Sequence, residues 1–163
     1  MKQSRSTLPE KKLIGLQVRT NNKTEIDSMT GKIFPIVQRF FQEQLFAKIP
    51  NRTKPGTTLC CYTDYESDHN GDYTYFIGEE VDTLKDVPAG FKTLTIPAQT
   101  YAIFTTEPAP MPDVIRNAWF SIWKMTDSDF GGPRRYATDF EVYDERASDH
   151  QKIVMDLYIG IDA

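Results

Sequence analysis

Hydrophobic and polar positions along the chain follow the same order twice. Each half places one strand-like segment before an amphipathic helical stripe and two strand-like segments after it. The segments of the first half are Leu13–Val18, the helix Ile33–Phe46, Leu59–Tyr65 and Tyr73–Glu79. Those of the second half are Tyr101–Thr105, the helix Val114–Met125, Phe140–Tyr143 and Ile153–Ile161. In both stripes apolar residues recur every three or four positions, as in a helix with one buried face.

The two halves also share residues in their last strands. Tyr75–Gly78 and Leu157–Gly160 each end in an aromatic or aliphatic run followed by Ile-Gly. The pattern predicts an α+β fold built from duplicated strand–helix–strand–strand units, repeat one at about 12–81 and repeat two at about 92–163. Because ligands often bind where two such halves meet, we expect a cleft between the repeats. Residues 1–11 are polar, and we expect a flexible tail ahead of a single domain, 12–163.

Charge and composition restrict the partners. The net charge is −4, and no basic stripe is available to neutralise phosphates, so direct nucleic-acid binding is not expected. No apolar run approaches a membrane span, and the N-terminal basic residues lack the apolar core of a signal peptide. Cys60 and Cys61 are adjacent and have no third cysteine to pair with. They indicate buried strand residues in a reducing cytoplasm, with a thiol switch as the alternative.

Familiar catalytic patterns are missing from the sequence. The two histidines, His69 and His150, fall in polar loops, which argues against a metal site or a Ser-His-Asp arrangement. Gly131–Gly132 lacks the lysine and spacing of a phosphate-binding loop. We therefore assign no catalytic residue, no metal ligand and no cofactor from the sequence.

The last two strands carry the sharpest candidate for a binding site. Alternation turns Glu141 and Tyr143 away from Phe140 and Val142 in the first of them. In the second, the polar set is Asp156 and Tyr158, and the aliphatic set is Leu157, Ile159 and Ile161. If both aliphatic sets pack on the helices, two carboxylates and two phenols share the opposite face. A sheet with one solvated face gives the same alternation, so this pattern alone leaves both interpretations open.

Aromatic residues make up 12% of the chain, and interleaved acids and aromatics suit an organic cation. Trp119 and Trp123 lie four apart on the second helix, where they can anchor the core or form a cleft wall. The sequence does not fix strand register, so it leaves open which tyrosines face the cleft. The candidates are Tyr62, Tyr73, Tyr75 and Tyr101, of which we take Tyr62, Tyr75 and Tyr101 as ligand-binding residues.

Several segments in order resemble the GyrI-like effector-binding family, and in particular stand-alone AraC-type effector-binding domains of integron cassettes. They are Leu13–Leu16, Tyr62–Tyr65, Gly71–Val81, Ile96–Ala98, the helix with Trp119 and Trp123, Asp139–Tyr143 and Asp156–Ile161. The resemblance covers residues 12–161. It implies a curved antiparallel sheet with two helices on one face and an aromatic cleft whose central acid meets cationic lipophilic compounds. Glu141 matches that acid; Tyr143, Asp156 and Tyr158 follow from the shared face only.

The resemblance implies a cytoplasmic protein that senses or sequesters a small cationic or amphipathic aromatic compound, as a monomer or homodimer. Relatives that regulate transcription carry a DNA-binding domain ahead of this one, so we expect any link to transcription to run through a DNA-binding regulator in trans. Gly160 stands where many relatives have proline. Two alternatives remain: a GyrI-like hydrolase of reactive electrophilic natural products, with Glu141 as general base, and a protein-interaction module of the gyrase-inhibitor type.

Overall fold

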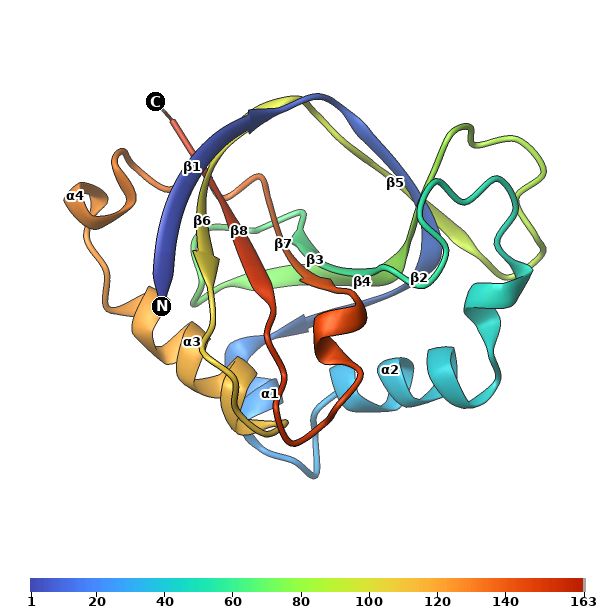
Figure 1. Cartoon of the computed structure of the whole chain (residues 1–163), viewed down its shortest axis with the longest axis horizontal. Coiled ribbons are helices and arrows are strands. Elements are labelled where there is room, and N and C mark those ends of the chain that lie inside the picture. Colours follow the sequence, from blue (N-terminus) through green and yellow to red (C-terminus); the bar gives the residue numbers. More distant parts are fainter. Residues whose placement is uncertain (163) are drawn as a thin grey trace.

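A computed structural model describes residues 1–162 of the chain (Figure 1). The strands are β1 (Lys2–Leu8), β2 (Lys11–Asn21), β3 (Thr58–Thr63), β4 (Asp72–Val81), β5 (Lys92–Ile96), β6 (Gln99–Thr105), β7 (Thr138–Tyr143) and β8 (Asp156–Ile161). The α-helices are α1 (Asn22–Ile26), α2 (Ile33–Gln42), α3 (Asp113–Trp123) and α4 (Asp127–Phe130). Two short 3-10 helices, η1 (Leu45–Lys48) and η2 (Glu145–Ala147), complete the described elements. Each of these helices is too short to cross a bilayer.

The described strands form one antiparallel sheet in the order β1-β6-β8-β7-β3-β4-β2-β5. The sheet curves strongly, and α1, α2 and α3 lie on its convex side, below the strands in Figure 1. Repeat one contributes β2, α2, β3 and β4, and repeat two contributes β6, α3, β7 and β8. The predicted α+β class and duplicated unit are therefore confirmed, and β3 and β7 join the repeats at the centre of the sheet.

Two segments differ from the expectation. The predicted flexible tail was wrong, because residues Lys2–Leu8 form β1 and pair along their whole length with β6. Its side chains are mostly exposed, so the strand is held by backbone hydrogen bonds that a hydrophobic pattern does not record. Directly after β2 the chain forms the short helix α1, whose amino end is capped because the Asn21 side chain accepts a hydrogen bond from the Thr24 amide. The first helix ends at Gln42, and a 3-10 turn follows.

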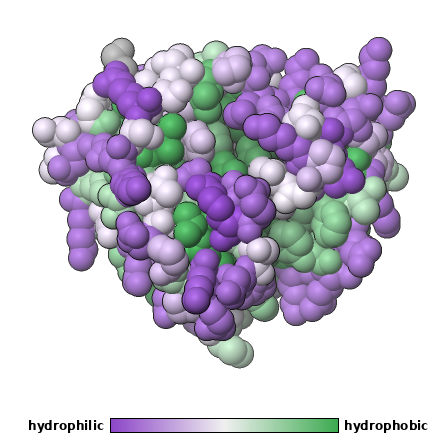
Figure 2. Space-filling model, in the orientation of Figure 1, coloured by the Kyte–Doolittle hydropathy of each residue, from purple (hydrophilic) through white to green (hydrophobic). Residues whose placement is uncertain are grey.

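The strands β1 and β5 exchange partners between the repeats. The strand β1 precedes β2 but pairs with β6, and β5 precedes β6 but pairs with β2. The two connections form an arch at the top of Figure 1. Hydrophobic side chains fill this arch, as Figure 2 shows. They form a second core on the concave side of the sheet: Leu13, Leu59, Cys61, Phe76, Ile96, Tyr101 and Phe140.

The convex side carries the cores beneath the helices. One cluster gathers around α3, with Val114, Ala118, Trp119 and Ile122 against Leu157 and Ile159 of β8. The other gathers around α2, with Phe40 and Leu45 against Ile14 and Ile77. The buried, unpaired Cys60 and Cys61 divide between the two sides of the sheet, as adjacent strand residues must. Tyr62 and Tyr143 pack against both helix-side clusters, so they lie at the junction of the two repeats.

Candidate effector-binding site

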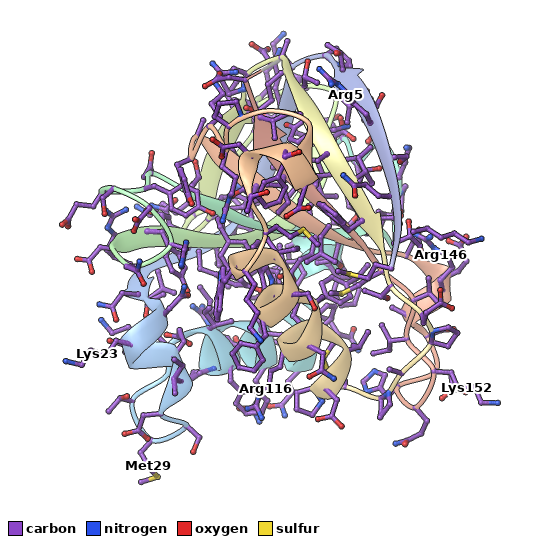
Figure 3. The ribbon with its side chains drawn as sticks, turned by 90° about the vertical axis from the view of Figure 1, so that its left-hand side faces the viewer. Arg5, Lys23, Met29, Arg116, Arg146 and Lys152 are labelled. Atoms are coloured by element: carbon purple, nitrogen blue, oxygen red, sulfur yellow. The ribbon has the colours of Figure 1, made fainter. Side chains whose placement is uncertain are left out.

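A pocket of about 340 Å³ opens between α1 and α3, where the two repeats meet. This volume is at the lower end of the range for small-molecule sites. Its walls come from α1 and the start of α2, from α3, and from the strand ends and loops below: Asn22, Glu25, Ile26, Ile33, Tyr62, Tyr65, His69, Tyr73, Ile115, Arg116, Trp119, Phe120, Trp123 and Arg134. Figure 3 looks onto this side, with Lys23 labelled on α1 and Arg116 in the first turn of α3.

Aromatic rings line the floor of the pocket in a continuous row. The ring centroid of Tyr62 lies 4.9 Å from that of Trp119 and 5.5 Å from that of Tyr73. Tyr65 continues the row 6.0 Å beyond Tyr73. Trp123 extends it at the other end, 6.4 Å from Trp119, and stacks on the His69 ring. Such ring faces suit a flat or cationic ligand.

Glu141 lies directly beneath this row and is 2% exposed. Its Oε2 accepts hydrogen bonds from the Tyr62 hydroxyl at 2.6 Å and from Trp119 Nε1 at 2.7 Å. Its Oε1 accepts one from the Tyr143 hydroxyl at 2.8 Å. All three donors are neutral, and no ion pair within residues 1–162 involves Glu141. The carboxyl group is thus satisfied by hydrogen bonds but has no compensating positive charge.

The surroundings of Glu141 perturb its titration and that of its neighbours. Burial raises the pKa of Glu141, although the bonds from Tyr62, Trp119 and Tyr143 oppose that rise. Burial, followed by the Glu141 charge, raises the pKa of Tyr62 well above its usual value. Burial does the same to the pKa of Tyr143. Both phenols therefore stay protonated and remain donors to the carboxyl group.

A second buried carboxylate, Asp139, lies two residues before Glu141 on the same strand face. Its Oδ2 accepts hydrogen bonds from the Tyr65 hydroxyl and from Arg134 Nη2, both at 2.7 Å. Its Oδ1 accepts the Gly160 amide at 2.8 Å. Asp139 thus differs from Glu141, because a guanidinium balances its charge.

The structure brings together six of the nine predicted ligand-binding residues. Tyr62, Trp119 and Trp123 line the pocket. Glu141 and Tyr143 lie below it, and Tyr75 supports it from behind, with its ring centroid 5.4 Å from that of Tyr62. The sequence left each tryptophan open as a core anchor or a cleft wall, and both line the pocket.

The other three predicted residues, Asp156, Tyr158 and Tyr101, lie on the concave side, so the expectation that they share a face with Glu141 was wrong. Glu141 pairs with Leu157, and Phe140 pairs with Tyr158. The actual register therefore differs by one residue from the assumed one, so Glu141 lies on the helix side with Leu157, while Asp156 and Tyr158 lie on the concave side with Phe140 and Val142. Tyr101 and Tyr158 pack on Phe140 under the arch, and Asp156 accepts hydrogen bonds from Thr105 and Arg146.

Sequence reasoning missed several residues of the pocket region, among them Asp139, Tyr65, His69 and Arg134, and left Tyr73 open. Asp139 continues the Glu141 alternation by one step, so the pattern could have found it. Tyr73, which the sequence left open, lines the pocket. Tyr65, His69 and Arg134 lie in connections beyond the strand ends, where no periodic pattern predicts their direction.

Comparison with known proteins agrees with this architecture. The family model for the integron-associated effector binding protein Cass2, a GyrI-like family, matches residues 6–161. The chain belongs to this family. YobU of Bacillus subtilis strain 168, which carries a transcriptional-regulator name, is 27% identical over 153 residues, covering 93% of this chain and 92% of YobU.

Solved structures share the fold. An integron cassette protein from the mobile metagenome of Vibrio cholerae superimposes with a TM-score of 0.76 at 24% identity, over 98% of this chain and 95% of its own. SAV2435 bound to tetraphenylphosphonium superimposes with a TM-score of 0.77 at 18% identity, over 100% of this chain and 95% of its own. These structures confirm the fold, and the family model confirms the predicted family and the coarse description of an effector-binding protein.

Proposed function

We propose that the protein binds a small organic cation with an aromatic or lipophilic body in the pocket between α1 and α3. The observation that supports this most is the uncompensated Glu141 carboxyl group beneath the Tyr62 and Trp119 rings. A cation over these rings is attracted both by their faces and by the carboxylate behind them. Donation of the Tyr62 hydroxyl and Trp119 N–H to a carboxylate also polarises both rings toward the ligand.

The site supports binding without any group poised for reaction. Each Glu141 oxygen already accepts at least one hydrogen bond, and the side chain is 2% exposed, so it stabilises charge at a distance rather than approaching a substrate. The tetraphenylphosphonium bound to SAV2435, a protein of the same fold, is a cation of the proposed class. We propose that the protein senses or sequesters such compounds in the cytoplasm, and that a separate DNA-binding protein carries any signal to transcription.

The experiment titrates wild type and Glu141→Gln with tetraphenylphosphonium, using tetraphenylborate as an anion of matched shape. Glutamine can keep the bonds from Tyr62 and Trp119 through its carbonyl and donate to Tyr143, so the fold should survive. We expect Glu141→Gln to weaken phosphonium binding by about 1–3 kcal/mol, the scale of the attraction between two opposite charges several ångströms apart at an effective dielectric constant of about 20. Glu107→Gln, the same change at an exposed position, is the control. Equal affinity of wild type and Glu141→Gln would remove Glu141 as the anchor.

A further inference from the structure

Arg134 is a buried cation in the wall of the pocket, and one of its buried nitrogen atoms, Nε, has no hydrogen-bond partner within residues 1–162. Its side chain is 5% exposed, and Nη2 donates to Asp139. The guanidinium lies 4.2 Å from the centroid of the Tyr136 ring. A buried N–H without a partner is costly. A ligand in the pocket that Arg134 lines could supply the missing acceptor.

Other groups near Arg134 favour the same kind of ligand atom. His69 lines the pocket, and burial and the Arg134 charge lower its pKa, so its ring is neutral at pH 7 and can hydrogen-bond to a ligand. Arg116, at the rim on α3, is exposed and takes part in no ion pair within residues 1–162. Asp139 balances the charge of Arg134, so of these two arginines Arg116 carries the uncompensated charge, which an oxygen acceptor on the ligand would also meet favourably.

A short row of aromatic rings connects the Glu141 end of the pocket to the Arg134 end. Tyr62 marks the Glu141 end, and Tyr65, which donates to Asp139, marks the Arg134 end. The Tyr73 ring contacts both, with centroid distances of 5.5 Å to Tyr62 and 6.0 Å to Tyr65. One ligand with two rings can therefore reach both ends.

We infer that the effector is dipolar: besides its cationic group over Tyr62 and Trp119, it carries an acceptor oxygen, a carboxylate or a carbonyl, that binds Arg134. This inference rests on the proposed function and specifies the ligand class of the same pocket. We expect a carboxylate to bind more tightly than an ester carbonyl, because the carboxylate is charged as well as the guanidinium that donates to it.

The test compares tetraphenylphosphonium with its 4-carboxyphenyl and 4-(methoxycarbonyl)phenyl analogues by calorimetric titration. Three proteins are compared: wild type, Arg134→Lys, and Arg135→Lys, which is the matched control outside the pocket. Lysine at 134 keeps a positive charge for Asp139 but removes the Nε donor. If that variant does not fold, Arg134→Met combined with Asp139→Asn removes both charges of the buried pair together.

We expect wild type and Arg135→Lys to bind the carboxylated analogue about tenfold more tightly than tetraphenylphosphonium, and Arg134→Lys to lose this preference. Equal affinities for all three compounds in wild type would overturn the inference and leave the cation pocket intact. A preference that persists in Arg134→Lys would overturn it as well. If only the carboxylated analogue binds, and Arg134→Lys abolishes that binding, the result supports the acceptor site and contradicts the cation site of the proposed function. Binding of none of the compounds would overturn both.

Discussion

Glu141 and Asp139 show how two buried carboxylates on one strand face come to differ. Both are held by three hydrogen bonds, but only Asp139 receives one from a guanidinium. A buried charge is costly unless it is paired, so Glu141 binds its proton more tightly than in water. The free pocket therefore holds a carboxyl group whose ionisation a positively charged ligand would favour.

The raised pKa of Glu141 predicts how stability depends on pH. The folded state binds this proton more tightly than the unfolded state, so the group's stabilising contribution is complete below the unfolded pKa and is lost as the pH rises through the folded pKa. Relative to Glu141→Gln, wild type should thus become less stable as the pH rises above 4.5, the ordinary pKa of a glutamate carboxyl group. Urea denaturation at several pH values measures the difference. A constant difference across that range would contradict a raised pKa.

The same titration couples to ligand binding. A cation above Tyr62 and Trp119 favours ionised Glu141, so binding should release protons and tighten as the pH rises through the raised pKa of this group. Calorimetry with tetraphenylphosphonium in buffers of different ionisation enthalpy measures this release. Glu141→Gln, which has no proton to lose at this position, should release none. Proton release of equal size in both proteins would assign it to another group.

Among the strands, β2 and β4 make an unusually close approach at a glycine pair. Gly15 lies opposite Gly78, and a Cβ added at Gly15 would come within van der Waals overlap of the Ile77 carbonyl oxygen and the Gly78 Cα. These are backbone atoms of a central strand, which cannot move aside as a side-chain end can. The glycines therefore allow two strands of the curved sheet to pack more tightly than residues with side chains would.

Gly15→Ala should accordingly destabilise the fold by about 1–3 kcal/mol, as overpacking in a core does. Gly31→Ala is the control, because the nearest atom to its added Cβ would be a Glu25 side-chain oxygen at 3.2 Å. Thermal and urea unfolding of both variants measure the costs. A Gly15→Ala protein as stable as Gly31→Ala would show that the strand contact relaxes freely.

The pattern of hydrophobic residues correctly predicted the elements that pack on a single core. It assigned the wrong face to a strand where both faces of the sheet carry a core. The β8 alternation correctly places Leu157 and Ile159 on α3. The same rule assigned Phe140 and Val142 to the helices, yet they pack under the arch, because this sheet buries apolar residues on both faces. Hydrophobic alternation identifies the two faces of each strand, but only the register between β7 and β8 decides which faces coincide. That register depends on contacts distant in sequence.

At the scale of the whole molecule, the pocket exists only because the repeats are joined. The helix α1 of repeat one and α3 of repeat two form opposite walls, and Tyr62 of repeat one donates to Glu141 of repeat two. The exchange of β1 and β5 ties the outer edges of the repeats together on the other side of the sheet. A ligand between α1 and α3 therefore contacts both repeats at once and should stabilise them together.

This arrangement predicts where a ligand protects the protein. Hydrogen exchange with and without tetraphenylphosphonium should slow at amides of α1 and α3 and change little in β1 and β5, which lie away from the pocket. Tyr62→Phe, which loses the donor to Glu141, should weaken binding by about 1 kcal/mol. Tyr101→Phe, the same change under the arch, should not. If protection is instead centred on β1, β5 and β6, and Tyr101→Phe loses binding, the ligand lies on the concave side. The core under the arch would then have to open to admit it.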